Sequence, residues 1–488
     1  MKKKLLVLLI PLVLIIIYLL PRKENKELVS NTDNLVSFTV DGVESKTMPT
    51  KGSGYIANKI TCKNGSIITF DNDNYIIEVE KLESDDACKI DFSKEIGSNT
   101  VTVTISNTSK IDSTSKTTTE GGKVMFYLTG EPDSITGGEY TLSDGKLIVN
   151  NIISNINLNI TMSKTLYDQL LIDNSRIKTR TDFDTTFTET NTGTLYKATE
   201  SIAGNTPKDV YYFAGDAKNN WVKFGGFYWR IIRTNYDESI RLLYSGTSHN
   251  TTSGYIWTSA FNSPYNDPML VGYMYGTSGS LASNRTNTNN SAIKTYIDNW
   301  YKNNLSSYSK YISTEAVYCN DRELAPGSTY NTGNTSFSYA TKERLNTNKT
   351  PTYNCTNIKD AFSGSNSEAK LTYPIGLMTA DEIAYAGGKE FTSLPSTYAW
   401  YYLNSAGGSI TGSTYWWSLS PFGWSGSYST VWVVFGSSNP GYLSYTRAND
   451  TSYGVRPAIS LKSCIKYSTG NGAPETPYEI VLDPDISC

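Results

Sequence analysis

An internal repeat in the first third of the chain constrains its fold more than any other sequence feature. The segment Ile76–Phe92 aligns without a gap on Lys146–Met162, at an offset of 70 residues. Apolar positions such as Val79 and Val149 coincide in this alignment, whereas most of the polar residues between them differ. A preserved apolar spacing with drifting polar positions indicates that one small β-module has been duplicated.

Strand-like alternation surrounds both copies of the repeat. Apolar residues alternate with polar ones at Val36, Phe38 and Val40, and again at Val101, Val103 and Ile105. A period of two residues is typical of half-buried strands. We therefore expect two small β-sandwich-like modules, at residues 35–96 and 97–162. Both are similar to the short Ig-like repeats that are common on the surface of Gram-positive bacteria.

The N-terminus has the pattern of an export segment. Three lysines follow Met1, and residues 5–20 form an apolar run that only Pro11 interrupts. A charged start and an apolar stretch of this length are typical of a secretory signal or a membrane anchor. No small-x-small cleavage triplet follows, which favours an uncleaved anchor over residues 1–22 rather than the alternative, a cleaved signal. The lysines should stay inside, so we expect a single-pass protein of the cell membrane with the bulk of its chain extracellular.

The six cysteines fit an extracytoplasmic chain. None belongs to a CxxC motif, which argues against zinc-ribbon and thioredoxin-like sites. They follow one another two by two along the chain, and the second copy of the repeat lacks equivalents of both Cys62 and Cys88. These observations favour local disulfides over the alternative, free thiols. The predicted pairs are Cys62 with Cys88, Cys319 with Cys355, and Cys464 with Cys488.

The rest of the chain is expected to form a linker and a head domain. Residues 163–206 are mostly polar, and the spacing of Leu166, Leu170 and Leu171 indicates one short helix within them. Residues 207–488 contain all nine tryptophans of the chain. We therefore place the linker at 163–206 and the head domain at 207–488.

The head domain has signals for both helices and strands. Apolar periodicity predicts an amphipathic helix from Ser291 to about Asn304. A capping box at residues 379–382 opens a second helix, and a hairpin turn is indicated at residues 235–238. The predicted fold class is therefore mainly β with some α: an N-terminal membrane helix, two β-modules and a C-terminal α+β domain.

Composition argues against several classes of site. The net charge of −3 argues against a nucleic-acid partner, and His249 is the only histidine, which rules out a multi-histidine metal centre. The sequence has no GxSxG elbow and no GxxxxGK[ST] loop, and the oxygen ligands around Asp71 and Asp73 match no complete EF-type loop. We expect no metal, no cofactor and no catalytic residue, and thus no enzyme. A serine or cysteine nucleophile that uses His249 is a minor alternative.

Five ordered motifs carry a family resemblance over residues 165–488. They are FGGFYWRIIR at 224–233, YCNDRELAPG at 318–327, LTYPIGLMTADEIAYAGG at 371–388, YWWSLSP at 415–421 and YGVRPAISL at 453–461. This pattern resembles a module of unassigned function in exported proteins of gut Gram-positive bacteria. More distantly, the helix start, the Trp-rich segment and the final Gly-Val-Arg strand are similar to the C-type lectin-like fold. The absence of a cysteine between Cys355 and Cys464 argues against the oxidase chemistry of that fold's enzymatic branch.

Aromatic residues set among Gly, Ser and Asn form the candidate ligand site. Flat, rigid aromatic side chains with adaptable polar neighbours are typical of recognition surfaces. The candidate binding residues, all within the segment 422–449, are Trp424, Tyr428, Tyr442, Tyr445, Arg447 and Asn449. The alternative is ordinary core or loop packing, and a core role is what we expect for Trp416 and Trp417.

The expected function is adhesion or recognition by a membrane-anchored cell-surface protein whose head binds an extracellular glycan or protein. Two alternatives stay open: an envelope or glycan-processing hydrolase, and a purely structural surface component. A pocket with convergent acids would favour the hydrolase, whereas a broad exposed face of Tyr and Trp would favour binding.

Overall fold

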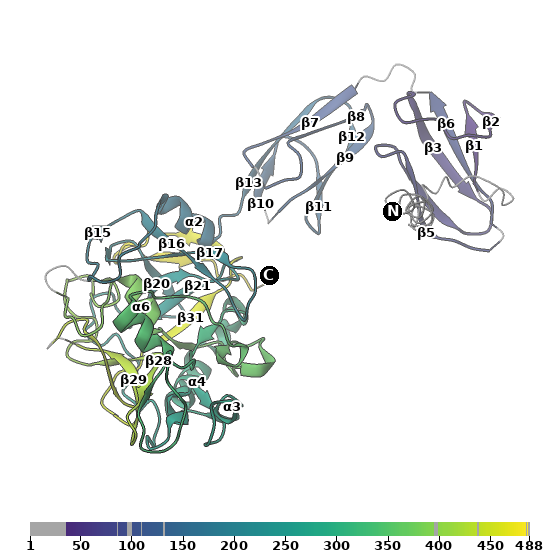
Figure 1. The fold of residues 1–488 in the computed structure, drawn as a ribbon. Coiled ribbons are helices and arrows are strands. Elements are labelled where there is room, and N and C mark those ends of the chain that lie inside the picture. The colour runs from purple at the N-terminus through teal and green to yellow at the C-terminus, as the bar shows by residue number, and fades with distance from the viewer. Residues whose placement is uncertain are drawn as a thin grey trace, which may run out of the picture. The chain divides into compact units, whose positions relative to one another are not determined.

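The structure is a computed structural model that describes residues 36–84, 86–94, 100–108, 110–129, 132–394, 399–436, 439–484 and 486. It is mainly β, as the sequence predicts. The chain divides into two compact units, Met1–Thr161 and Met162–Cys488 (Figure 1). Within the described residues, no helix is long and apolar enough to cross a membrane. The anchor predicted at residues 1–22 lies outside them.

The first β-module is built around a parallel pair of strands. Its strands are β1 (Val36–Val40), β2 (Val43–Ser45), β3 (Tyr55–Cys62), β4 (Ile67–Asp71), β5 (Ile76–Lys81) and β6 (Cys88–Lys94). Four of them form a sheet in the order β2-β1-β6-β3, and β4 pairs with β5. β1 and β6 run parallel, with Val36 opposite Cys88 and Val40 opposite Phe92. The disulfide between Cys62 and Cys88 joins the neighbouring strands β3 and β6, which confirms the first predicted pair.

The second β-module repeats this arrangement. Its strands are β7 (Thr100–Ser106), β8 (Ser115–Thr119), β9 (Gly122–Tyr127), β10 (Pro132–Thr136), β11 (Thr141–Ser143), β12 (Lys146–Ile152) and β13 (Ile156–Met162). Its first and last strands, β7 and β13, again pair in parallel, and β12 pairs with β9 as β5 pairs with β4. The two aligned segments of the repeat thus form corresponding strands, which supports a duplicated module.

The second unit, which we call the head, contains two main sheets. The larger has ten strands: β14 (Arg176–Lys178), β16 (Thr194–Glu200), β17 (Lys208–Tyr212), β19 (Trp221–Phe224), β20 (Phe227–Thr234), β21 (Ile240–Tyr244), β27 (Gly376–Leu377), β31 (Pro457–Leu461), β32 (Tyr467–Thr469) and β33 (Tyr478–Ile480). The smaller has the order β25 (Phe337–Ser338), β28 (Trp416–Trp424), β29 (Ser429–Val434) and β30 (Leu443–Arg447).

Short strand pairs and helices complete the head. The pairs are β15 (Thr190–Asn191) with β18 (Asp216–Ala217), β22 (Met274–Tyr275) with β23 (Asn289–Asn290), and β24 (Tyr318–Cys319) with β26 (Ala361–Phe362). The helices are α2 (Leu166–Asp173), α3 (Leu281–Asn284), α4 (Ala292–Asn304), α5 (Ala340–Lys342) and α6 (Ala380–Ala386). Shorter turns are η1 (Pro268–Val271), η2 (Ser306–Tyr311), η3 (Glu343–Asn348), η4 (Ile358–Asp360) and η5 (Ser367–Ala369).

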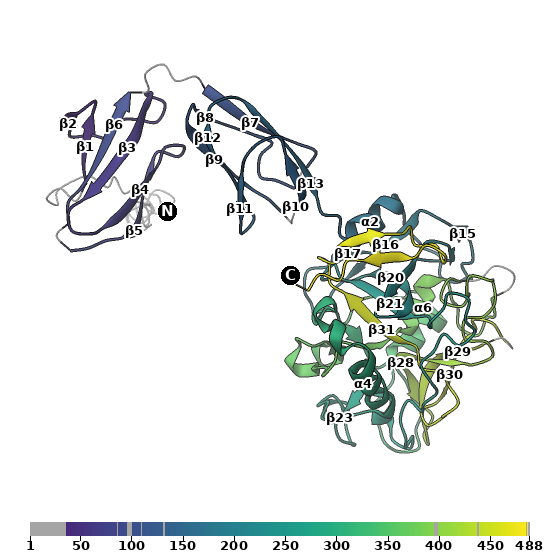
Figure 2. The same ribbon diagram turned by 180° about the vertical axis from the view of Figure 1, so that it is seen from behind.

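One hydrophobic core connects the two sheets of the head. Five tryptophans are completely buried in it: Trp229, Trp400, Trp416, Trp417 and Trp432. Strands β20, β21 and β31 run through the middle of the head beside α6, and α4 is seen clearly from behind (Figures 1 and 2). Because each aromatic side chain buries a large apolar area, this core contributes much of the stability of the head. The predicted core role of Trp416 and Trp417 is confirmed.

The predicted local elements of the head are also present. Ser291 is the N-cap of α4, and α6 begins with the expected capping box between Thr379 and Glu382. α6 ends at Gly387, whose φ of 120° is a conformation that glycine adopts readily. The turn at residues 235–238 joins β20 to β21.

Residues 163–206 belong to the head, which corrects the expected linker. α2 forms where a short helix was predicted, but its Leu166 and Leu170 are buried in the core of the head. β14 and β16 extend one end of the ten-stranded sheet. The N–H of Leu166 donates to the carbonyl of Ile465, so the two ends of the head lie side by side. The polar sequence concealed these strands because strands near a sheet edge carry polar side chains.

Among the remaining four cysteines, the structure describes one complete predicted pair and one member of the other. Cys319 and Cys355 form a disulfide, which confirms the second pair. Cys464 is also disulfide-bonded. Its predicted partner, Cys488, lies outside the described residues.

Candidate ligand-binding surface

The segment predicted to form the ligand site contains β29 and β30. These strands pair antiparallel, with Trp432 opposite Tyr445 and Thr430 opposite Arg447. Tyr445 and Arg447 are two residues apart on one strand, so their side chains lie on the same face of the sheet. The structure therefore brings these two predicted binding residues together.

Tyr445 rests on a rigid aromatic base. Its side chain is 42% exposed, although one face of its ring stacks on Phe422 with the centroids 3.7 Å apart and the planes at 15°. Phe422 in turn packs against the completely buried Trp432. Burial of Phe422 and Trp432 fixes the orientation of the Tyr445 ring, which keeps exposed area for contact with a ligand.

Phe391 is an exposed aromatic residue that the sequence interpretation missed. It is 39% exposed, and its ring centroid lies 6.1 Å from that of Tyr445 and 6.0 Å from that of Tyr442. Its φ of 52° is a left-handed conformation that is uncommon for a bulky residue. The N–H of Phe391 donates to the carbonyl of Leu443, which holds it beside β30. A single phenylalanine between polar neighbours gave no periodic signal.

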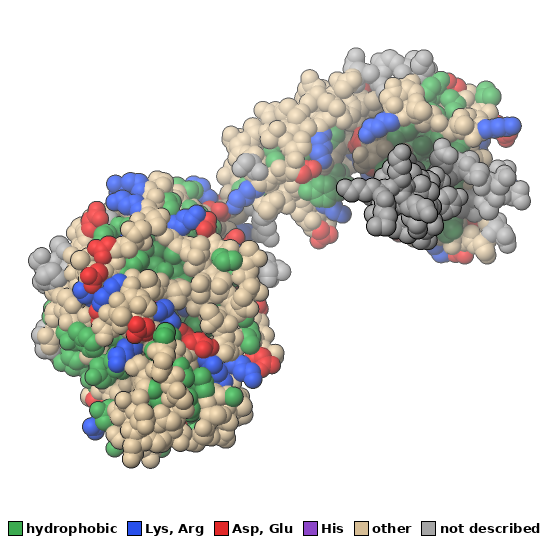
Figure 3. All heavy atoms as spheres, viewed as in Figure 1, with side chains coloured by type: hydrophobic (Ala, Val, Ile, Leu, Met, Phe, Trp, Pro, Cys, Tyr) green, Lys and Arg blue, Asp and Glu red, His purple; other side chains and the backbone are tan. Residues whose placement is uncertain are grey.

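Two cations border these rings. The guanidinium of Arg447 lies 4.4 Å from the ring centroid of Tyr428, and the ammonium of Lys342 lies 5.0 Å from that of Phe422. Lys342 also donates to the hydroxyl of Ser338. We call the set Phe391, Phe422, Tyr428, Tyr442, Tyr445 and Arg447 the aromatic face. Figure 3 shows hydrophobic side chains at the surface of the part of the head that holds β29.

Trp424 is not part of this face, which corrects its assignment as a binding residue. It is only 4% exposed, and its indole N–H donates to the carbonyl of Gly333 over 2.8 Å. The Gly- and Ser-rich neighbours suggested an exposed loop, but β28 pairs with both β25 and β29 and is therefore a central strand. Tyr428, Tyr442 and Asn449 are half-buried.

Trp257 is a second exposed aromatic residue outside the predicted set. Its side chain is 65% exposed. Its carbonyl accepts the N–H of Val455, which places it against the segment that precedes β31. Single exposed apolar side chains are common on protein surfaces, so this exposure alone assigns no role to Trp257.

His249, the histidine considered above as a partner for a nucleophile, contacts a serine. Its Nδ1 lies 2.8 Å from the Oγ of Ser405, and that hydroxyl donates to Oδ1 of Asn250. The tautomer of the imidazole decides which of the two groups donates, and a general base needs the form in which the serine hydroxyl donates to the imidazole.

The charged residues of the family-like motifs form a buried ionic network. Arg233 donates to Glu200 over 2.9 Å and to Glu382 over 2.8 Å, and Arg241 donates to Glu382 over 3.0 Å. Burial alone would raise the pKa of Glu382, but the two guanidinium groups hold the pKa below its usual value. Burial opposes the charge of Arg233 as well, yet its two carboxylate partners raise its pKa. The network holds β16, β20, β21 and α6 together.

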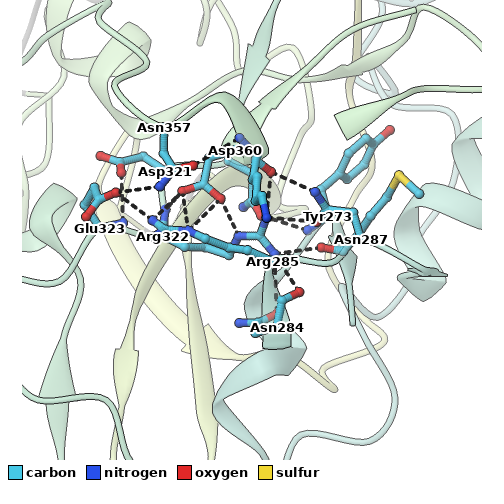
Figure 4. Close-up of polar contacts among 12 residues, drawn as sticks. Tyr273, Asn284, Arg285, Asn287, Asp321, Arg322, Glu323, Asn357 and Asp360 are labelled. Atoms are coloured by element: carbon cyan, nitrogen blue, oxygen red, sulfur yellow. Dashed lines mark hydrogen bonds and ion pairs between the residues drawn. The ribbon is translucent and has the colours of Figure 1, made fainter. Parts of the chain in front are cut away.

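A second network surrounds the buried carboxylate of Asp360. In Figure 4 the guanidinium groups of Arg285 and Arg322 both point toward it, at 2.7 Å for the shortest contact of each. Arg322 also donates to the Oδ1 of Asn287, and Arg285 also contacts Glu323. Both carboxylate oxygens of Asp360 accept at least two hydrogen bonds from described residues. These bonds hold neighbouring segments together and occupy the oxygens that a ligand would need.

Arg456, in the final motif, has a different environment because no carboxylate of the described residues forms an ion pair with it. Its guanidinium donates to the carbonyls of Tyr244 and Tyr401 and lies 4.8 Å from the ring centroid of Trp416. Burial, together with the nearby Arg230, lowers the pKa of Arg456 to about 9. The arginine of this motif therefore ties the start of β31 to β21 and to the segment that contains Tyr401.

Within the described residues, the cluster that comes closest to a metal site is Cys62, Asp86 and Cys88. Both of its sulfur atoms are bonded to each other, so they are not available as thiolate ligands. In comparisons with known proteins, no family model, no curated protein and no solved structure matches the chain.

Proposed function

We propose that this chain is a membrane-anchored cell-surface protein whose head has a C-type lectin-like fold and binds an extracellular ligand through the aromatic face. The observation that carries the proposal is the exposed ring of Tyr445, stacked on Phe422 and flanked by the exposed ring of Phe391. The export-like N-terminus and the disulfides support an extracellular location.

A carbohydrate is the ligand class that fits this face best. An exposed ring held rigidly on a second ring offers a flat platform, and a sugar ring can stack on it with little loss of side-chain entropy. Arg447 lies on the same strand face as Tyr445, and its guanidinium can donate hydrogen bonds to hydroxyl groups. Half-buried Asn449 follows two residues later in the chain and is a further candidate donor. The rings of Tyr445 and Phe391 are 42% and 39% exposed, which suits part of a longer glycan better than an enclosed small molecule.

The test is glycan-array binding by the full chain and by three variants. We expect Tyr445→Ala and Phe391→Ala each to weaken binding at least ten-fold, about 1.4 kcal/mol, with the melting temperature nearly unchanged because both side chains are exposed. The matched control is Tyr140→Ala, which removes a 41% exposed tyrosine from the second β-module. Equal binding by all variants, or no glycan bound at any concentration, would refute the proposal.

A further inference from the structure

We infer that the head has a second ligand site, a groove beside Tyr236 that takes a small organic cation with an apolar body. The groove has a volume of about 420 Å³, within the range of small-molecule sites. It lies at the β20–β21 turn, and the aromatic face is built on other strands, β28 to β30. The polar and charged lining residues that bear on the ligand are Glu200, Lys208, Asn235, Tyr236, Asp237 and Glu315.

The walls of the groove are apolar and held in place. Ile202 and Ala361 pack together with Cys355, and Val317 packs against the same cluster. The Cys319–Cys355 disulfide ties this cluster together covalently. A preformed apolar wall favours a ligand with an aliphatic or aromatic body, because little ordering of the protein is needed on binding.

The groove includes three carboxylates, which accept hydrogen bonds and cannot donate them when ionised: Glu200, Asp237 and Glu315. Asn235 is almost completely buried in the wall, where its amide donates to the hydroxyls of Ser239 and Ser460. Asp237 accepts hydrogen bonds from Ser239 and Ser313 but forms no ion pair with a described residue. Glu315 is exposed and likewise has no basic partner there. A ligand that donates hydrogen bonds fits these groups better than one that accepts them.

The charged side chains of the groove also favour a cationic ligand. Glu200 is already neutralised by Arg233, with contacts of 2.9 and 3.1 Å. The one basic side chain in the lining, Lys208, is held by the Tyr236 ring at 4.4 Å and donates to the carbonyl of that residue. The carboxylates of Asp237 and Glu315 therefore outnumber the cation, and a primary ammonium group on the ligand restores the balance.

The experiment compares phenethylamine with its neutral analogue 2-phenylethanol and with the anion 3-phenylpropionate, by titration calorimetry and ligand-observed NMR on the full chain. We expect phenethylamine to bind at least ten-fold more tightly than 2-phenylethanol and 3-phenylpropionate to bind least. Glu315→Gln should reduce the affinity for phenethylamine several-fold and leave that for 2-phenylethanol unchanged. Asn205→Trp, which fills the groove from an exposed position, should abolish binding of both.

The controls separate charge from folding. Glu479→Gln removes an exposed acid elsewhere on the head and should change neither affinity nor melting temperature. Equal affinities for the amine and the alcohol, or an unchanged amine affinity in Glu315→Gln, would overturn the assignment to a cation. Absence of binding by all three probes would overturn the groove as a site. Glycan binding through the aromatic face is measured separately, and neither result decides the other.

Discussion

At the scale of single residues, the motif charges are explained by packing rather than by chemistry. Glu382 accepts hydrogen bonds from Arg233, from Arg241 and from the N–H of Thr379, all of them buried. The sequence could not indicate this role, because a charged residue in a motif is equally compatible with catalysis. Only the pairing of residues that are more than 140 positions apart shows that Glu382 is bound by two guanidinium groups.

Replacement of Glu382 tests this role. We expect Glu382→Gln to destabilise the head by about 3–5 kcal/mol, because two buried guanidinium groups lose their shared carboxylate. The measurement is urea unfolding followed by tryptophan fluorescence, with the exposed Glu479→Gln as the control. The lowered pKa of Glu382 means that its stabilisation is present above the pKa of the unfolded chain and is lost on acidification. The variant should therefore show a weaker loss of stability toward low pH than the wild-type chain, and a variant with an unchanged midpoint would contradict the argument.

At the scale of elements, local sequence signals predicted those helices and strands whose position depends on nearby residues. Capping residues placed α4 and α6, and period-two alternation placed β1 and β7. The same signals failed for Trp424 and for residues 163–206, because burial there is decided by strands that pair across long sequence separations. Phe391 was missed for the same reason, since its exposed position depends on a contact with β30.

The disulfide of the first β-module joins strands β3 and β6, and the second β-module has no cysteine at the corresponding positions. Removal of the disulfide tests how much the bond contributes to the stability of the first module. We expect Cys62→Ala/Cys88→Ala to lower the stability of this module by about 3 kcal/mol, as the chain-entropy relation gives for a sequence separation of 26 residues. Differential scanning calorimetry should show one transition moved to lower temperature and that of the head unchanged. A shift of the head transition instead would contradict the separation of the two units.

At the scale of the whole molecule, the division between residues 161 and 162 predicts that the head folds independently. Residues 162–488 include α2 and β14, which a boundary at residue 207 would remove. We expect the fragment 162–488 to melt within a few degrees of the head transition of the full chain, because its core is complete. The fragment 207–488 should be insoluble or strongly destabilised, since it lacks the buried Leu166, Leu170 and Leu195. Equal melting temperatures for both fragments would contradict this boundary.

The parallel pairing of the first and last strands has a mechanical consequence. In each β-module the chain enters along one strand, β1 or β7, and leaves along its parallel neighbour, β6 or β13. Tension applied to the two ends of a module would therefore pull these neighbours past each other along their length. All backbone hydrogen bonds between them would bear the load together, whereas in a hairpin pulled from its open end they would break one after another. Such modules would resist stretching because their paired strands are loaded in shear, which would suit the adhesion role proposed above.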